Sequence, residues 1–457
     1  MRHDVTAIQT AEAPDWLRPP ADADALSAKL WPCTAHRGPD GEMRLGGIGL
    51  PDLADRFGTP AYLFDQADFQ SRCEGFRAAF HDFDVYYAGK SFMAKAVVRQ
   101  VAAAGLSLDV CSEGELAVAR AAGFPAERML LHGSNKSDQE LAAAVEQGVG
   151  RVVIDSYDEI ARLTALARER GVRPAVLLRV TVGIRSDAHA HNATAHEDQK
   201  FGFSISSGAA TAAVGQVLDA GVLELRGLHS HIGSQILDPT GFEIATRRAI
   251  GLLASIADRH GVLLPELSVG GGFGIAYTEA DEPAMPKELA DRIRSAAVLE
   301  CGRLGIDPPR LAIEPGRAIV GQSGCTLYRV GTVKRLAGFR TYISVDGGMS
   351  DNIRPALFGA NYSVALANRT SAAEPTLVRV VGKHCDAGDI VVRDAFLPAD
   401  IRPGDLLALP ATGAYCRSLS NNFNSTPRPP VVGVQDGRAR EIIRRETVTD
   451  LLGLDVG

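Results

Sequence analysis

The stretch VYYAGKSFMAKAVVRQVAAAGLSLDVCSEGELAVARAAG, residues 85–123, contains the pattern that decides the fold. Its short apolar runs at 85–88 and 106–110 have the length and composition of buried strands. Each run is followed by a segment of helical periodicity, at 94–104 and at 114–122. A strand followed by an amphipathic helix is the repeating unit of a parallel sheet, so this stretch predicts two such units in succession.

The same alternation continues along the chain to about residue 317. We predict further strands at 129–132, 152–155, 176–180, 225–229, 267–269 and 311–314, and further helices at 138–147, 156–170 and 242–260. Eight strand–helix units within roughly 235 residues match the typical size of a (β/α)8 barrel of the TIM type, and they fit a doubly wound sheet less well.

Beyond residue 320 the apolar pattern changes to an alternation of two, which indicates an all-β domain. Its strands are predicted at 326–330, 342–345, 378–381, 390–392 and 406–409. We therefore predict an N-terminal arm with strands that join the β domain (1–58), a barrel (59–320) and a C-terminal β-sandwich or Greek-key barrel (321–457). The first 40 residues are expected to be loosely held, and a strand-like piece near 44–49 is expected to join the β domain.

The composition is that of an ordinary globular protein, with 46% hydrophobic and 23% charged residues in 457, and it excludes collagen, coiled coil and extensive disorder. A formal net charge of −7 offers no basic surface for nucleic acid or an anionic membrane. The cysteines are scattered without a CxxC pair, so neither a disulfide framework nor a metal site is expected. No signal peptide and no apolar run of ~18 residues is found, and we expect a cytoplasmic protein.

Polar residues follow several predicted strands at their C-terminal ends, which in a (β/α)8 barrel form the face that holds the active site. Lys90 follows the first strand, His231 and Ser234 the sixth, glycines 270–272 the seventh, and Glu314-Pro315-Gly316-Arg317 the eighth. The glycine loop lets backbone N–H groups approach a phosphate, whereas the carboxylate of Glu314 would repel one and must serve another part of the ligand. Pyridoxal phosphate, with its basic ring nitrogen and its need for a Schiff-base lysine, uses all of these groups.

Each of these residue types also has an ordinary structural role that requires no active site. Lys90 could be a surface lysine, and His231 could be a core histidine bonded to backbone. Tyr415 could be an edge-strand aromatic, Cys385 a buried small hydrophobe and Arg354 a solvated surface charge. The position of Lys90 at the end of an apolar strand favours a functional interpretation for that residue.

Long motifs make the chain resemble a known enzyme family from about Gly46 to the C-terminus. They are YYAGK, LDVCSEGEL, HGSNKS, TAHEDQKFG, HSHIGSQI, EPGRAIVG, SVDGGMSDNIRPAL, GKHC and ATGAYC. With them the chain resembles the actinobacterial diaminopimelate decarboxylases, which are fold type III pyridoxal-phosphate enzymes like ornithine decarboxylase and alanine racemase. The resemblance implies an alanine racemase-like fold, pyridoxal 5'-phosphate as cofactor, and conversion of meso-2,6-diaminopimelate to L-lysine and CO2 in lysine biosynthesis.

The resemblance also implies roles for single residues around the cofactor. Lys90 would hold the cofactor as a Schiff base, His231 would stack on its ring, and Glu314 would pair with the protonated ring nitrogen. The phosphate would be held by Ser234, Gly270, Gly271, Gly272, Gly316 and Arg317, with Tyr415 beside them.

On the substrate side, the resemblance implies a homodimer with shared active sites. Cys385 would come from the partner subunit and protonate the carbanion left by CO2. Arg317 and Arg354 fall where the family binds the far carboxylate of the substrate, and bidentate guanidinium groups suit that task. Phe358, Asp386 and Tyr415 are expected to line the same pocket.

The chain departs from the family pattern toward the distal end of the substrate. Asp386-Ala387 stands where the family has Glu-Ser, Phe358 where a tyrosine is usual, Asn421-Asn422-Phe423-Asn424 in place of Ser-x-Tyr-Asn, and 184–191 differs from the usual lid sequence. Asp is shorter than Glu by one methylene, roughly 1.5 Å. Phe lacks a hydroxyl that could donate to a carboxylate.

These departures leave open a paralogue that decarboxylates another amino acid, either in a specialised pathway or with a basic distal group. A catalytically silent regulatory homologue is disfavoured, because Lys90, His231, Glu314, Cys385 and Tyr415 are all present. A racemase is disfavoured because that branch has an arginine opposite the ring nitrogen, where this chain has glutamate.

Overall fold

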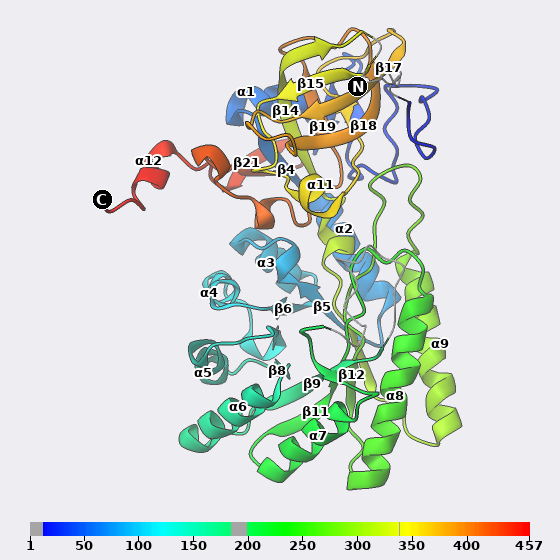
Figure 1. The fold of residues 1–457 in the computed structure, drawn as a ribbon, viewed down its shortest axis with the longest axis vertical. Coiled ribbons are helices and arrows are strands. Elements are labelled where there is room, and N and C mark those ends of the chain that lie inside the picture. Colours follow the sequence, from blue (N-terminus) through cyan, green and yellow to red (C-terminus); the bar gives the residue numbers. More distant parts are fainter. Residues whose placement is uncertain (1–11, 184–198, 338) are drawn as a thin grey trace, which may run out of the picture. The chain divides into compact units, whose positions relative to one another are not determined.

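The computed structural model describes residues 12–183, 199–337 and 339–457 of the chain (Figure 1). The chain forms two compact units, each assembled from separate stretches of sequence. The β unit contains Met1–Phe69, Ala276–Glu282 and Val320–Gly457, and the barrel unit contains Gln70–Ile275 and Pro283–Ile319.

Eight parallel strands close into a barrel in the barrel unit. They are β5 (Asp84–Ala88), β6 (Ser107–Val110), β7 (Met129–Leu131), β8 (Arg151–Ile154), β9 (Ala175–Thr181), β11 (Glu224–His229), β12 (Glu266–Ser268) and β13 (Arg310–Ile313). The order is β9-β11-β12-β13-β5-β6-β7-β8, and β8 pairs with β9 to close the ring. The short strand β10 (Phe203–Ser204) adds to β9. The predicted (β/α)8 barrel is therefore confirmed, with a strand at each of the eight predicted places.

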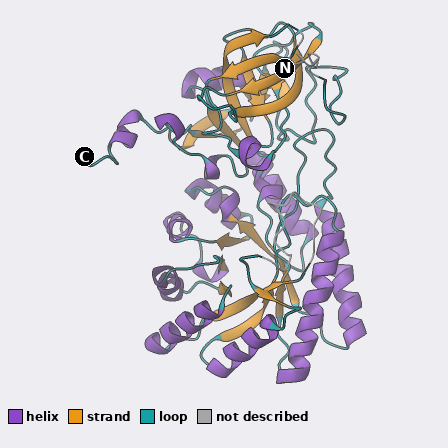
Figure 2. Ribbon diagram, in the orientation of Figure 1, coloured by secondary structure: helices purple, strands orange, loops and turns teal. Residues whose placement is uncertain are grey.

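Helices surround these strands (Figures 1 and 2). They are α2 (Gln66–Ala79), α3 (Lys95–Ala103), α4 (Glu113–Ala122), α5 (Asp138–Gln147), α6 (Tyr157–Arg170), α7 (Ala209–Ala220), α8 (Thr240–His260), α9 (Pro286–Leu304) and α10 (Arg317–Val320). In the described part of the chain no helix combines the length and the apolar character needed to cross a membrane.

Three consecutive barrel helices begin in the same way, directly after a strand and its loop. Ser112, Ser137 and Ser156 are the N-caps of α4, α5 and α6, and each side chain accepts a hydrogen bond from the backbone N–H of a glutamate three residues later. The helices end at Gly123, Gly148 and Gly171, all in the left-handed conformation. A serine cap stabilises a helix by about 1 kcal/mol, so these local signals fix where each helix starts and stops.

The β unit is built on a long sheet with the order β18-β17-β15-β14-β4-β20-β21, and β19 pairs with β14 and β16. Its strands are β4 (Ala61–Asp65), β14 (Gly324–Arg335), β15 (Thr341–Val345), β16 (Ala365–Leu366), β17 (Pro375–Val381), β18 (Ile390–Pro398), β19 (Leu406–Leu409), β20 (Val431–Gln435) and β21 (Arg438–Ile443). Its helices are α1 (Leu50–Phe57), α11 (Arg354–Phe358) and α12 (Val448–Leu452). The prediction of a separate β domain is thereby confirmed, although the unit also contains short helices and is β-rich rather than all-β.

Strand β4 comes before the barrel in sequence, yet it belongs to the β unit. It pairs antiparallel with β14 and parallel with β20, and all five of its residues are buried. Residues 59–69, which the sequence interpretation placed in the barrel, therefore lie in the β unit. The strand-like piece near 44–49 belongs to the β unit, as expected, and its Met43, Leu45 and Ile48 lie in the core of that unit. Its strands β2 (Met43–Leu45) and β3 (Ile48–Gly49) form a separate small sheet with β1 (His36–Arg37).

The N-terminal arm is held more firmly than its composition suggests. Leu30 and Trp31 are 3% and 5% exposed and belong to the core of the β unit. Arg37 donates to the carbonyls of Leu366 and Arg369, and the backbone N–H of Cys33 donates to Asp68. The expectation of a loose arm is thus wrong for the segment around residues 30–37, because a buried tryptophan and an arginine anchor it; residues 1–11 lie outside the described part.

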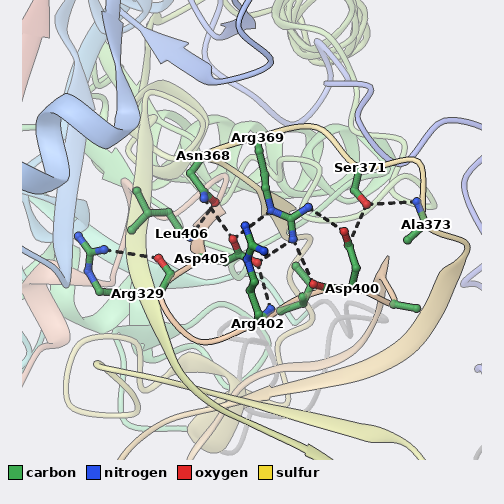
Figure 3. A network of polar contacts seen from close by, with 12 residues as sticks. Arg329, Asn368, Arg369, Ser371, Ala373, Asp400, Arg402, Asp405 and Leu406 are labelled. Carbon is green, nitrogen blue, oxygen red and sulfur yellow. Dashed lines mark hydrogen bonds and ion pairs between the residues drawn. The ribbon is translucent and has the colours of Figure 1, made fainter.

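A polar network around buried Asp405 holds the turn before β19 (Figure 3). Arg369 donates from Nε and Nη2 to the two carboxylate oxygens of Asp405, at 3.1 and 2.9 Å, and from Nη1 to Asp400 at 3.0 Å. Asn368 and the backbone of Arg402 also donate to Asp405. Burial would raise the pKa of Asp405, but these donors hold it below its usual value, so the turn is organised around an anion.

Asp351 in the β unit is a buried carboxylate without an ion-pair partner among the described residues. It is 1% exposed and accepts hydrogen bonds from the Tyr328 hydroxyl and from the backbone N–H of Gly348. Burial raises the pKa of Asp351 to about 6, although these hydrogen bonds oppose the rise.

Asp351→Asn is expected to flatten the dependence of stability on pH. Because the folded pKa lies above that of an unfolded aspartate, about 4, stability that is present below pH ~4 is lost as the pH rises through ~6. The loss is on the order of 2 to 3 kcal/mol, and an amide that cannot ionise avoids it. Urea unfolding between pH 4 and 7 measures the free energy of unfolding of each variant. The control Asp307→Asn, at an exposed position, should follow wild type. If the free energy of unfolding of Asp351→Asn changes with pH as steeply as that of wild type, the prediction is contradicted.

Candidate active site

Lys90 lies directly after β5, in a single turn of 3-10 helix formed by Gly89–Ser91. Its neighbours in that turn are buried, whereas its own side chain is exposed. A lysine held by a buried turn at the mouth of a barrel has a fixed backbone and an accessible amine. These are the properties that a Schiff-base lysine needs.

Glu314 follows β13 and is 3% exposed. The Ser268 hydroxyl donates to Oε1 at 2.6 Å, and the Nε2 atoms of His229 and His132 each lie 3.2 Å from the carboxylate. Burial would raise the pKa of Glu314, but His229 and His132 outweigh it and hold that pKa well below the usual value. The group is therefore a buried anion at neutral pH.

His231 is a neutral imidazole in the same barrel mouth. Enclosure by the barrel, with further contributions from Lys90 and Arg179, lowers the pKa of His231 well below its usual value. Its Nδ1 accepts a hydrogen bond of 3.3 Å from the backbone N–H of Gly271, which fixes the ring beside the glycine loop. A fixed, uncharged imidazole can stack on a flat ring.

The loop Gly270–Gly272 has no room for side chains. A Cβ atom at positions 270, 271 and 272 would lie 2.3, 2.1 and 2.3 Å from backbone oxygens of Ser230, Glu314 and Gly233. Beside it the Arg317 guanidinium donates to the Ser234 hydroxyl at 2.7 Å. A close-packed backbone loop with a guanidinium and a hydroxyl fits a phosphate group, so the barrel residues fit the cofactor that the sequence predicts.

Four buried residues around Glu314 were not among the predicted site residues: Asp109, His132, His229 and Ser268. Burial raises the pKa of Asp109 to about 6, although His132 opposes the rise. His132, His229 and Glu314 have side-chain nitrogen and oxygen atoms within 4.8 Å of one another. The sequence held a signal for them, because each lies within one residue of the C-terminal end of a predicted strand.

The remaining predicted residues, apart from Gly316, lie in the β unit. Arg354 is 5% exposed, its guanidinium carbon lies 4.6 Å from the centre of the Tyr277 ring, and it donates to the Tyr362 hydroxyl. Among the described residues no carboxylate forms an ion pair with it. Arg354 is therefore not a solvated surface charge, and a buried cation in this state favours an anionic ligand.

Cys385 and Asp386 lie on an exposed loop that one carboxylate fixes. Asp389 accepts from the backbone N–H groups of His384 and Met349 at 2.7 and 2.6 Å. The thiol of Cys385 is exposed, which excludes the interpretation as a buried hydrophobe. Asp386 accepts from the N–H of Gly388 at 2.7 Å, so its carboxylate shapes its own turn.

Tyr415 and Phe358 are both half-buried in the β unit. Tyr415 has a φ of 60°, a left-handed conformation that a bulky residue rarely adopts and that is concentrated at functional sites. Gly316, in contrast, lies in the barrel unit, where a Cβ would meet Ala88 at 2.9 Å. The segment 184–191, predicted to differ from the family's lid, lies outside the described residues.

Comparisons with known proteins relate the whole chain to one group of enzymes. Residues 66–321 match the model of the pyridoxal-binding domain of pyridoxal-dependent decarboxylases. The diaminopimelate decarboxylase of Mycobacterium tuberculosis is 50% identical over 440 residues, covering 94% of this chain and 98% of the relative. That of Bacillus subtilis is 44% identical over 427 residues, covering 93% and 97%. The crystal structure of diaminopimelate decarboxylase from M. jannaschii with L-lysine has a TM-score of 0.88 at 28% identity, covering 94% of this chain and 99% of that chain.

Proposed function

Because this chain belongs to the diaminopimelate decarboxylase family of pyridoxal-dependent decarboxylases, we propose that it converts meso-2,6-diaminopimelate to L-lysine and CO2. The observation that carries the proposal is the buried anion Glu314 in the same barrel mouth as the accessible amine of Lys90. The identity of about 50% to a curated relative over nearly the full length favours this substrate over that of a paralogue.

Bound pyridoxal phosphate supplies an electron sink for the electron pair that remains when CO2 departs. We assign its anchoring to the chain's own groups: Lys90 forms the covalent link, and Glu314 holds a proton at the ring nitrogen. His231 orients the ring by stacking. Ser234, the loop 270–272, Gly316 and Arg317 bind the phosphate, with Tyr415 beside them.

The β unit would supply the substrate contacts. Arg354, a buried cation, is assigned to the distal carboxylate of the substrate. Phe358, Asp386, Tyr415 and, from the barrel unit, Arg317 are assigned as further substrate-binding residues. The exposed thiol of Cys385 is assigned as the proton donor, acting in the site of a partner subunit. This assignment makes the active enzyme a homodimer, and we place it in the cytoplasm, where a thiol stays reduced.

A substrate panel tests the proposed function. Purified protein is expected to decarboxylate meso-diaminopimelate with a kcat/KM at least about a hundredfold above that for lysine, ornithine or arginine, because those lack the carboxylate that would pair with Arg354. CO2 release for each compound is the measurement, with the LL isomer as a stereochemical control. A preference for one of the basic amino acids would overturn the assignment of substrate.

The same panel tests the distal departures. With meso-diaminopimelate as substrate, the double variant Asp386→Glu and Phe358→Tyr is expected to change kcat/KM by less than about threefold, because the carboxylate of Asp386 is used in its own turn. A gain of tenfold or more on meso-diaminopimelate would instead mean that wild type is adapted to another distal group.

A further inference from the structure

We propose that His132 and His229 are positioning residues that keep Glu314 ionised and aimed at the ring nitrogen of the cofactor. The inference rests on the proposed function, since it assigns a role toward the same cofactor. Both imidazoles are buried, and neither has a part in binding or proton donation as assigned above.

The two imidazoles approach the carboxylate from different strands of the barrel. His229 ends β11 and His132 follows β7, and each Nε2 lies 3.2 Å from a carboxylate oxygen of Glu314. Their rings meet edge to face with centroids 4.7 Å apart, so each ring restricts the other. Together with the hydroxyl of Ser268, they surround the carboxylate with three polar groups.

Both histidines are neutral, and the Nε2 atom of each faces Glu314. Burial lowers the pKa of His132 and of His229 below the usual value, although Glu314 opposes the fall in both. Nδ1 of His229 has no hydrogen-bond partner within the described chain, which places its single proton on Nε2, facing Glu314. The other charged groups near the pair are Asp109, 3.8 Å from Nε2 of His132, and Arg179 and Lys90, which both act on His229.

The physical requirement for such donors is clear from the burial of Glu314. A buried carboxylic acid without donors is protonated near neutral pH and cannot hold a protonated ring nitrogen. A hydrogen bond from neutral His229, with the Nε2 of neutral His132 3.2 Å from the carboxylate, favours the anion without adding a positive charge that would compete with the ring. Removal of either donor therefore raises the pKa of Glu314 and weakens cofactor binding as the pH falls.

Matched amide variants test the inference at each histidine. The amide nitrogen of glutamine reaches the place of Nε2, whereas that of asparagine is one methylene shorter, roughly 1.5 Å, and does not reach. We therefore compare His229→Gln with His229→Asn, and His132→Gln with His132→Asn. Full-length protein depleted of cofactor is titrated with pyridoxal phosphate between pH 6 and 8, and dissociation constants are read from the visible absorbance. Thr164→Val, at a buried hydroxyl on α6, is the control for a change of buried polarity.

Each asparagine variant is expected to bind pyridoxal phosphate about tenfold more weakly at pH 6 than at pH 8, beyond any change in wild type. The glutamine variants and Thr164→Val should stay within about threefold of wild type at every pH. The inference is overturned if the asparagine variants keep the affinity and pH dependence of wild type. It is also overturned if they lose affinity equally at every pH. Thermal unfolding shows whether each variant is folded. If a variant at one histidine does not fold, the glutamine and asparagine variants at the other histidine still test the inference.

Failure of the proposed function gives a different result. In that case wild type releases little or no CO2 from meso-diaminopimelate, whether or not it binds pyridoxal phosphate. The inference alone is overturned when wild type does both and the asparagine variants match it.

Discussion

Lys90→Ala is expected to abolish covalent attachment of pyridoxal phosphate and to lower kcat by a factor on the order of 10⁴ or more. Lys90 lies on a turn whose other residues are buried, so the backbone of this turn is fixed. It cannot shift to bring another lysine into the place of Lys90. The measurement combines the visible absorbance of the purified protein with CO2 release from meso-diaminopimelate.

The matched control is Lys95→Ala, which removes an exposed amine at the start of α3, five residues further along the chain. This variant should keep both the absorbance and the activity of wild type. If Lys90→Ala retains the absorption band after dialysis and reduction with borohydride labels another residue, the assignment of Lys90 is wrong.

Mixing two inactive variants, Lys90→Ala and Cys385→Ala, is expected to restore activity. If Cys385 acts in the site of the partner subunit, a mixed dimer contains one site with both native residues. Random exchange of subunits then returns about a quarter of the wild-type sites, since a two-fold interface contributes to both sites. The two variants are mixed, exchange is verified by mass, and CO2 release is followed with time.

The control for this experiment mixes Lys90→Ala with Glu314→Ala. Both changes lie in the barrel unit, so each barrel of a mixed dimer lacks one required residue and this mixture should stay inactive. No recovery in the first mixture after confirmed exchange, or equal recovery in both mixtures, would contradict the assignment of Cys385 to the partner's site.

The barrel could be predicted from sequence because its signals are local. Each apolar run is short, is followed by a helix, and several helices carry their own serine cap and terminal glycine. Helix α7 was not predicted, since an alanine-rich segment such as 209–220 has little contrast between its faces. Residues 61–65 were placed within the barrel, and no strand was predicted there, because the partners of this strand, β14 and β20, lie hundreds of residues away and no local pattern identifies them.

The candidate site divides in the same way. Lys90, His231 and Glu314 stand at strand ends in long motifs, so position alone indicated them. The partners of Glu314 were missed because His132, Ser268 and His229 come from three different strands, and their distances depend on the closed barrel. The burial of Arg354 against Tyr277 could not be read from its sequence neighbours either.

The position of β4 also sets the timing of folding during synthesis. Phe64 pairs with Gly324, so β4 leaves the ribosome about 260 residues before its neighbour β14, an interval of roughly 10 to 50 s at about 5 to 20 residues per second. Throughout that time the barrel can form while an apolar strand with two open edges is exposed in the nascent chain. We therefore expect a chaperone to bind the growing polypeptide at this segment. The edges of β4 are covered only when its partners β14 and β20, in the last third of the chain, have been translated.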